Sequence, residues 1–483
     1  MFDMKSLLAP LVPAKAPARS AKPFTKDDAA RMLDVTSEAL DAFEASYRTN
    51  VLDMLPEDAD VFHVNAKQAS EMAKAKAPDV SLAEADSLID AIVEELLAQT
   101  RVLEYDGKSM SVKTFDAVGP APAPVTPDVI NRLPAELRPQ LTGIHAMRDI
   151  EAPTGLTVLS MYKNYLEAKE PKSRNMYYGM FRQGLDILDL DPLTYEIIGR
   201  NMNSMGHWLP ALAAAVGKQD FFRVPATKVL KIPVTLLQLT RMDYAGLTPS
   251  TKAVVDRFCF RAFGLDESRD YFIKTGTYSS KFDFRNAHVH GAKEVRELGE
   301  YLLFIHFQAC QMASPLAEPR IFGVSTTNEW VVRDYIPDTQ GLPCIYKGLP
   351  LRTEYRVFVD FDTDEILGAN PYWDPTVMLD RFGSQADAGD PHQMHDYVIY
   401  KNQADRLAET YARNIETVKA RVAAMLPDID LPGQWSVDVM QDGDDFYVID
   451  MALAANSALS GCVPKGKLRP ATEDWLPEIP KGG

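Results

Sequence analysis

Two aspartates near the C-terminal end of the chain, in the strand-like segments WSVDVM and FYVIDM, have the spacing of a cation-binding pair. The turn that joins these segments contains Asp-Gly, which is typical of a hairpin. With residues 441–445 as its loop, Asp438 lies opposite Val448. Asp450 then lies opposite Ser436, so the two carboxylates are diagonal neighbours on one face and can bind one magnesium ion together with phosphate oxygens. The alternative is that both aspartates are simply solvated at a strand edge.

A lysine at the end of a short strand favours phosphate binding. Lys274 ends the segment YFIK and is followed by the small, polar, glycine-containing sequence TGTYSSK. Backbone amides of such a loop can surround a phosphate group while the lysine supplies a positive charge. The sequence GxxxxGK[ST] does not occur, which argues against a P-loop NTPase. Nucleic-acid ligases that attach AMP to a lysine are a rival class, but the KTGT sequence here lacks the aspartate of their KxDG motif.

The segment RTEYRVFVDF has the alternation of a strand with one apolar face. Tyr355, Val357 and Val359 share that face, while Glu354 and Arg356 share the other. Such a strand usually covers a core and turns its polar face toward water. Beside a lysine loop and an aspartate hairpin, the Glu-Arg pair can face a ligand instead.

A mixture of helices and strands must position these residues. Helices are expected over 250–265, over 293–312 and, from the apolar spacing, around 407–425. Strands are expected at YFIK, at EWVVRDYI and at the segments described above. Residues 224–239 contain β-branched residues and two prolines, which predict short edge strands and turns. The expected fold class is therefore α+β.

The chain is long enough for two or three domains. The proline-rich sequence VGPAPAPVTP is typical of a stiff linker, and the sequence on both sides of it is mostly helical in pattern. No internal repeat is visible. The expected division is a flexible tail over 1–24, a helical N-terminal domain over 25–117, the linker over 118–127, a helical region over 128–224, an α+β domain over 225–465 and a C-terminal tail over 466–483.

Composition limits the partners. The chain has 68 acidic and 51 basic residues and a net charge of −17. Such a surface repels phosphate backbones, so general nucleic-acid binding is not expected. No run of about 18 uncharged apolar residues occurs, so no membrane span is expected. Within the first 24 residues the apolar run is interrupted by prolines, which favours a flexible tail over a signal peptide.

Cysteines and histidines give little sign of a metal centre. The four cysteines are scattered without a CxxC pair, which fits a reducing cytoplasm. His288 and His290 form one candidate pair and His392 and His395 another, but no third ligand at a sensible spacing supports zinc. His207, just ahead of Trp-Leu-Pro, is expected at a loop corner.

The order of these elements resembles that of an ATP-grasp domain. The lysine strand and loop, a helix, EWVVRDYIP, RTEYRVFV, a second helix and the two-aspartate hairpin follow one another over about Pro225 to Ser460. The sequence motifs are most similar to those of the eukaryotic cell division cycle 123 family. That family has a lysine strand with a serine-rich loop and an Arg-containing hinge strand. It also has a strand close to EFRVFV and a hairpin with Asp in each strand. The resemblance implies two α+β subdomains that clamp ATP and Mg2+ between them.

The resemblance also implies roles for individual residues. Lys274 would contact the α- and β-phosphates, and the loop from Thr275 to Lys281 would fold over them. Arg356 would meet the transferred phosphate, with Glu354 orienting it. The loop residues assigned to the nucleotide on this basis are Thr275, Gly276, Ser279, Ser280 and Lys281.

A hinge and a metal site complete the implied set. The hinge would pair with adenine through its backbone, and Asp334 could reach the ribose. Its residues are Arg333, Asp334, Tyr335 and Ile336. Asp438 and Asp450 would bind Mg2+. The superfamily usually has Asn two residues after the last acidic ligand, where this chain has Ala452, and Asn456 is the nearest substitute.

Two functions are compatible with these residues. The first is an ATP-dependent ligase that joins a carboxylate to an amine or a thiol through an acyl phosphate, with charge neutralised by Lys274, Arg356 and magnesium. The helical N-terminal regions would then supply substrate specificity. The second is an ATP-binding assembly or chaperone-like factor, in which ATP orders a partner-binding surface without ligase turnover.

Overall fold

The computed structural model describes residues 82–98, 100–115, 198–241, 244–312, 325–383 and 391–469, with isolated residues between 161 and 195. The expected tail over 1–24 and the linker over 118–127 lie outside these residues. So do residues 25–81 of the expected helical N-terminal domain, most of residues 128–197 of the next expected helical region, and residues 470–483 of the expected C-terminal tail. Within the described residues, no helix is both long enough and apolar enough to cross a membrane.

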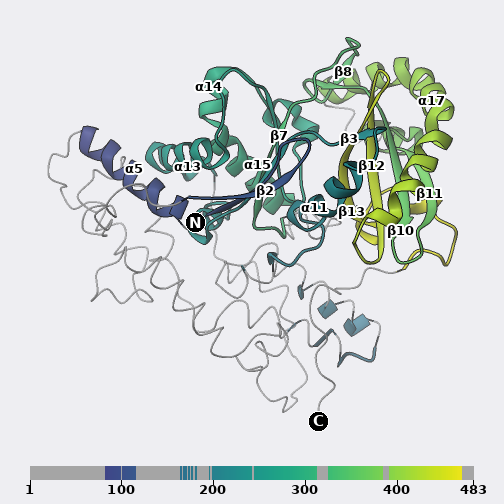
Figure 1. Ribbon diagram of the computed structural model, residues 1–483, viewed down its shortest axis with the longest axis horizontal. Coiled ribbons are helices and arrows are strands. Elements are labelled where there is room, and N and C mark those ends of the chain that lie inside the picture. Colours follow the sequence, from purple (N-terminus) through teal and green to yellow (C-terminus); the bar gives the residue numbers. More distant parts are fainter. Residues whose placement is uncertain are drawn as a thin grey trace.

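The first of two large sheets has six strands in the order β2-β1-β4-β7-β5-β6, and all neighbouring strands in it are antiparallel. Figure 1 labels β2 and β7 of this sheet. Its strands are β1 (Arg101–Tyr105), β2 (Met110–Thr114), β4 (Thr227–Lys231), β5 (Tyr271–Thr275), β6 (His288–Val289) and β7 (Glu329–Asp334). The lysine strand and the expected hinge strand, β5 and β7, are neighbours at its centre.

The second sheet has five strands in the order β11-β10-β12-β13-β3. Its strands are β3 (Phe222–Arg223), β10 (Thr353–Asp360), β11 (Glu365–Pro371), β12 (Gln434–Asp442) and β13 (Asp445–Leu453). Only β3 runs parallel to its neighbour. A small ladder of β8 (Cys344–Ile345) and β9 (Leu349–Pro350) precedes β10 in the chain.

Side chains alternate cleanly across the centre of the first sheet. Ile273, Trp330 and Val332 are buried with the helices on one side, α5 (Leu82–Ala98), α13 (Pro249–Phe263) and α15 (Leu298–Met312). Val331 lies on the other side and belongs to the core shared with the second sheet. Lys274 pairs with Val331, and Arg333 lies two residues after Val331 in β7, so both are on the same face as Val331. Both side chains therefore point toward the second sheet.

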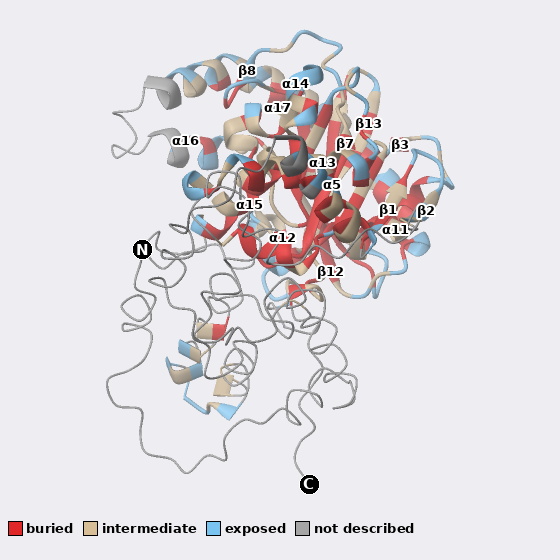
Figure 2. Ribbon diagram, turned by 90° about the vertical axis from the view of Figure 1, so that its left-hand side faces the viewer, coloured by how far each residue is buried: buried red, intermediate tan, exposed pale blue. Residues whose placement is uncertain are grey.

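The core between the two sheets contains helix α11 (Met205–Val216). Trp208 and Leu209 of α11 are buried in one cluster with Val331 of the first sheet and Val437 of the second. The long helix α17 (Pro391–Met425) packs on the second sheet, where Val418 belongs to the same cluster. The buried residues, red in Figure 2, lie mainly in the strands and in the helices that pack against them. The two sheets are held together by packing around α11.

The expected α+β class is confirmed, and the helix around 407–425 is part of α17. Helix α13 begins after the capping residue Thr248 and ends at Gly264, whose φ of 55° is in the left-handed region. The single helix expected over 293–312 is two helices, α14 (Gly291–Arg296) and α15, separated at Glu297.

Residues 224–239 differ from the expected edge strands. Strand β4 lies inside the sheet between β1 and β7, and residues Val234–Leu239 form the short helix α12. An interior position is possible because the two prolines, Pro225 and Pro233, flank β4 and leave its own N–H groups available for the ladder.

The N-terminal part also differs from expectation. Residues 101–114 form a β-hairpin within the stretch expected to be a helical domain over 25–117, and β1 pairs with β4. Asp106-Gly107 makes its turn, with Gly107 at φ 96°. Helix α5 contacts α13, where Arg257 binds Asp86 and Asp90 at 2.7 and 2.9 Å. The described residues 82–115 are therefore part of the same packed unit as the first sheet.

Candidate active site

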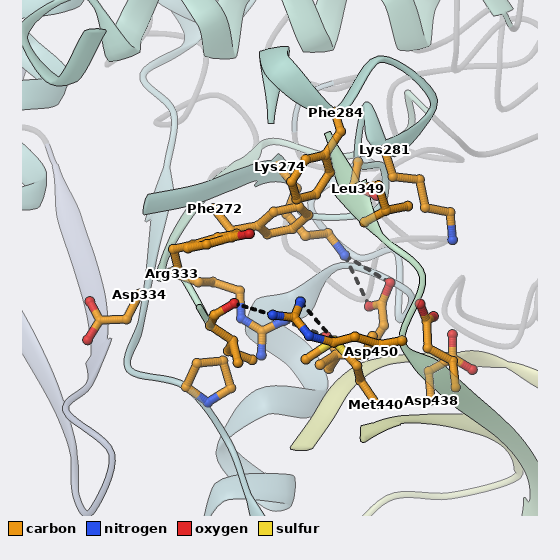
Figure 3. Close-up of a pocket in the computed structure, with 17 residues that line it drawn as sticks. Phe272, Lys274, Lys281, Phe284, Arg333, Asp334, Leu349, Asp438, Met440 and Asp450 are labelled. Atoms are coloured by element: carbon orange, nitrogen blue, oxygen red, sulfur yellow. Dashed lines mark hydrogen bonds and ion pairs between the residues drawn. The ribbon is translucent and has the colours of Figure 1, made fainter. Parts of the chain in front are cut away.

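A cleft lies between the two sheets and collects charged residues from both of them (Figure 3). It encloses about 810 Å³, including space open to solvent. The predicted residues that line it are Lys274, Ser279, Lys281, Arg333, Asp334, Tyr335, Ile336, Glu354, Asp438 and Asp450. The lining residues that the sequence interpretation missed are Pro225, Phe272, Phe284, Leu349, Arg352, Met440 and Ile449.

Lys274 spans the cleft from β5 of the first sheet to β13 of the second. Its Nζ lies 3.0 Å from Oδ1 and 3.1 Å from Oδ2 of Asp450, and Figure 3 shows the two side chains facing each other. The Lys274 side chain is only 3% exposed, whereas that of Asp450 is 40% exposed. The ammonium is therefore enclosed by protein, while the carboxylate remains accessible from the cleft.

The hairpin brings Asp438 and Asp450 together in a register that differs from the expected one. Its turn has two residues between the paired Asp442 and Asp445, and Asp438 lies directly opposite Asp450. The ladder shifts by one residue because Ile449 is an extra residue, a β-bulge, in β13. Without the shift, Asp438 would face Ile449 and Asp450 would turn toward the core. The bulge places both carboxylates on the cleft side.

Arg356 lies beside Asp438 on the neighbouring strand, in register with it. Its Nε and Nη2 donate to Asp438 Oδ1 and Oδ2 at 2.8 and 2.6 Å, a bidentate pair, and its Nη1 donates to the Ala458 carbonyl at 3.2 Å. The guanidinium also lies 5.0 Å from the ring centroid of Tyr372. Arg356 therefore holds Asp438 in place at the edge of the cleft and does not itself line it.

Glu354 is buried near this arginine, and Lys281 is half-buried there. Lys281 Nζ hydrogen-bonds the Tyr372 hydroxyl and lies 3.9 Å from the centroid of its ring. Burial lowers the pKa of Lys281, and the negative charge of Glu354 opposes that shift. Burial raises the pKa of Glu354 to about 7, opposed by Lys281. A lysine and a carboxyl group with shifted pKa values in a cleft are typical of sites that handle charged ligands.

The loop after Lys274 is firmly held, and three of its predicted residues do not line the cleft. Thr275 accepts from the Tyr278 amide at 2.9 Å, and the Ser280 hydroxyl donates to Gln308 at 3.0 Å. The Gly276 amide donates to the Glu329 carbonyl at 2.9 Å. These contacts are within the protein, so the loop reaches the cleft only through Ser279 and Lys281.

Glu329 explains the glycine in this loop, and no sequence signal identified its role. Its buried carboxylate accepts from the Gly206 amide at 2.9 Å, at the start of α11. A Cβ on Gly276 would lie 2.4 Å from Thr327 Oγ1 and 2.9 Å from Glu329 Oε2. Only glycine allows the loop to approach the hinge strand this closely.

The hinge residues line the cleft, but much of their hydrogen bonding is internal. The amides of Asp334 and Tyr335 donate to the carbonyls of Ala226 and Asp270 at 2.9 and 3.1 Å. The Asp334 carboxylate binds Arg269 and lies on the opposite side of the Lys274–Asp450 pair from Asp438 in Figure 3.

Arg352 is the most informative of the missed residues. Its Nη2 donates to the Ile336 carbonyl at 2.9 Å, and its Nε lies 3.2 Å from Asp442 Oδ1. Both members of this ion pair are 4% exposed. The pair joins the end of the hinge to the hairpin, an arrangement that only the pairing of β10 with β12 creates.

Asn456 is not brought to the aspartates by any contact in the described residues. It is exposed, and its Oδ1 accepts from Asn203 at 3.2 Å. Asn203 in turn accepts from the Leu453 amide at 2.7 Å. Asn456 therefore belongs to a hydrogen-bonded connection between β13 and the segment before α11, away from the cleft lining.

Two of the histidines set aside earlier have defined places. His288 stacks on Tyr335 with ring centroids 3.8 Å apart and so supports the hinge from behind. His207 lies inside α11 and not at a loop corner, with Nε2 2.9 Å from the Gly199 carbonyl. Among the described residues, no group of three or more His, Cys, Asp or Glu side chains is arranged to hold a metal ion.

No protein-family model and no curated protein matches the chain. Among solved structures, a C-terminally truncated Cdc123 from Schizosaccharomyces pombe is similar over 56% of this chain and 87% of that chain, at 14% identity and a TM-score of 0.31. Another structure of Cdc123 from the same organism covers 52% and 84%, at 15% identity and a TM-score of 0.30. A likeness this distant carries no argument about function, which must come from the cleft itself.

Proposed function

We propose that the cleft binds ATP with magnesium and that the two sheets act as the two halves of an ATP-grasp domain. The observation that carries this proposal is the charge arrangement between the sheets. Lys274 and Arg333 of the first sheet face Asp438 and Asp450 of the second across an open cleft. Cations for phosphate oxygens and a carboxylate pair for a divalent ion are the two requirements of a metal–nucleotide site.

The donor set fits magnesium. Two carboxylates directly opposite on neighbouring strands supply oxygen ligands, and the absence of a third acidic ligand in the described residues leaves positions for phosphate and water. Asp450 is the accessible member of the pair. Magnesium supplies neutralisation of phosphate charge when it is bound. Asn456 has no part in this assignment because it hydrogen-bonds Asn203 instead.

Apolar side chains also line the cleft. Phe272, Phe284, Leu349 and Met440 provide this apolar lining, as adenine requires. Because the amides of Asp334 and Tyr335 already donate to protein carbonyls, we assign the Ile336 amide to the base.

Ligase chemistry is the activity we assign to the charged residues of the cleft. Lys281 and Glu354 line it, and Arg356 orients Asp438. A partly buried cation such as Lys281 suits an acceptor carboxylate, since it offsets the repulsion between that carboxylate and a phosphate. The residues of this chain would bind the reactants, hold them in line and exclude water, with no need for a side-chain nucleophile.

An assembly factor that binds ATP without turnover is the second candidate, and one observation favours it. Ala452 stands where the superfamily usually has Asn, and Asn456 is tied to Asn203 away from the cleft. A site with fewer metal ligands can keep nucleotide binding while losing transfer. The large acidic excess of the chain is compatible with either function.

Calorimetric titration of ATP with and without magnesium tests the binding proposal. We expect Lys274→Ala to weaken nucleotide binding about tenfold or more, as expected for a lost charge-assisted contact. Asp450→Ala should remove most of the magnesium dependence. Lys218→Ala, which breaks an exposed ion pair with Asp428, serves as the control. No ATP binding by the wild type would refute the proposal.

Turnover assays separate the two activities. A ligase releases ADP and phosphate with magnesium, and the rate rises when a carboxylate and an amine are supplied together. A factor binds ATP without release and co-purifies with a protein partner. A covalent AMP adduct on the protein would instead support the nucleotidyl-lysine class.

A further inference from the structure

The side chain of Arg333 is buried with an unused hydrogen-bond donor. It is 3% exposed and lines the cleft. Its Nε donates to Thr227 Oγ1 at 3.2 Å, and its Nη1 donates to the carbonyl of the bulge residue Ile449. Its Nη2 is buried and has no hydrogen-bond partner among the described residues. Buried donors of this kind are rare, because an unsatisfied charged group carries a large desolvation penalty.

Arg333 lies next to Lys274 on the face of the first sheet that faces the second sheet. Arg333 pairs with Phe272 in the ladder of β5 and β7, so Lys274, two residues further along β5, is its diagonal neighbour on the same face. The two side chains contact consecutive residues of β13, Ile449 and Asp450. One guanidinium and one ammonium therefore flank the same stretch of the second sheet.

The charge around Arg333 is incompletely balanced. Asp450 is the nearby carboxylate that opposes the effect of burial on Arg333, and it is already paired with Lys274. Burial lowers the pKa of Arg333 to about 10, so the guanidinium is still protonated at neutral pH. A second anion between Arg333 and Lys274 would satisfy the free donor and complete the charge balance.

We infer that Arg333 Nη2 and Lys274 Nζ together form a binding site for a phosphate or pyrophosphate group at the centre of the cleft. The inference rests on the proposed nucleotide function and deepens it. The sequence interpretation assigned only the backbone of Arg333 to the ligand, as part of the hinge that pairs with adenine. The inference adds that the Arg333 side chain binds a phosphate. The contribution of Arg333 is then to phosphate affinity and not to recognition of the base.

Three probes separate these contributions: pyrophosphate, ADP and adenosine, each titrated calorimetrically without magnesium. We expect Arg333→Met to weaken binding of pyrophosphate and of ADP by about tenfold or more, as for a lost charge-assisted hydrogen bond. Adenosine affinity should change by less than about twofold on the same grounds. Arg333→Lys keeps the positive charge but lacks the planar guanidinium with its several N–H donors. It should retain part of the pyrophosphate affinity.

Arg421→Met is the matched control, because it removes one positive charge from an exposed site on α17 in a chain that is already acidic. It measures the effect of net charge on anion binding. If Arg333→Met loses as much affinity for adenosine as for pyrophosphate, or keeps its pyrophosphate affinity, the anion site is overturned. The proposed nucleotide function is not overturned by that result. Pyrophosphate binding by the wild type without any binding of ADP or adenosine would overturn the nucleotide function alone. No binding of any of the three probes by the wild type would overturn both.

Discussion

Charged side chains in the cleft are buried because each has an opposite charge or a hydrogen-bond partner from another strand. Arg356 holds Asp438 by two short hydrogen bonds, and Arg352 holds Asp442 where neither is exposed. Glu354 differs from these residues. Burial raises its pKa, and the charge of Lys281 only partly offsets that effect. It is therefore the group whose protonation should be most visible in the stability of the protein.

Replacement of Glu354 by glutamine should reveal this group. The folded-state pKa is about 7 against an ordinary value of 4.5, so folding favours the protonated form. Stability relative to Glu354→Gln is thus fully present below about pH 4.5 and is lost as the pH rises through about 7, by roughly 3 kcal/mol at most. Urea unfolding of both proteins between pH 4.5 and 8 measures the difference.

Glu365→Gln provides the comparison at an exposed position of β11. The difference between it and the wild type should vary little across the same range, because the ion pair of Glu365 with Lys467 is exposed and contributes little. The stability of the wild type relative to Glu354→Gln could instead stay constant or rise as the pH increases. Either result would show that Glu354 is ionised in the folded protein at low pH.

At the scale of single elements, two local features place the functional groups. The bulge at Ile449 turns Asp450 toward the cleft and leaves a carbonyl for Arg333. The close approach of the loop at Gly276 to Glu329 holds the segment that follows Lys274. Both features depend on the exact path of the backbone, so substitutions there should act on the cleft indirectly.

Gly276→Ala tests the loop. The added methyl group would overlap Thr327 and Glu329, and overpacking of this kind costs about 1–3 kcal/mol of stability. ATP affinity should fall as well, because the loop begins at Lys274. Thermal unfolding and calorimetry measure the two effects.

Gly461→Ala is the matched change, since a Cβ there meets no atom within 4 Å. Both its stability and its ATP affinity should stay close to those of the wild type. A Gly276→Ala protein as stable as the Gly461→Ala protein would mean that the loop can move away from Glu329 at little cost.

At the scale of the whole molecule, the two sheets are joined by the apolar core around α11 and by an ion pair across the cleft. Trp208 of α11 is buried in the core that both sheets share. Beyond that core, the Lys274–Asp450 pair crosses directly from one sheet to the other. This pair should therefore couple the two sheets even without a ligand.

A double-mutant cycle measures that coupling. Lys274→Met, Asp450→Asn and the double variant are unfolded in denaturant without nucleotide. We expect the double variant to be more stable than the sum of the single losses predicts, by about 1 kcal/mol, because either single change leaves a charge in the cleft without its partner. Partial exposure of Asp450 limits the size of the effect.

The exposed pair Lys218–Asp428 is the comparison, with its atoms 2.6 Å apart but side chains 59% and 38% exposed. Its coupling should be about 0–0.5 kcal/mol, as for surface ion pairs in general. A cleft pair that couples no more strongly than this one does not link the sheets.

The sequence by itself determined the types of the elements that carry Lys274, Glu354, Asp438 and Asp450. Alternation in β10, strand endings at Lys274 and the Asp-Gly turn are local patterns, and local patterns depend on backbone periodicity. They singled out Lys274, Glu354, Asp438 and Asp450, and these four residues line the cleft.

Only the tertiary structure decided which faces meet. Thr275 and Gly276 hydrogen-bond within the protein and do not line the cleft, and Asn456 hydrogen-bonds Asn203. Arg352 hydrogen-bonds the carbonyl of Ile336 in the expected hinge. The hairpin of residues 101–114 pairs with the first sheet. Each of these results depends on contacts between residues far apart in the chain, or on a one-residue shift such as the bulge at Ile449. Periodicity carries no information about such pairings, because one extra residue reverses the face of every side chain that follows.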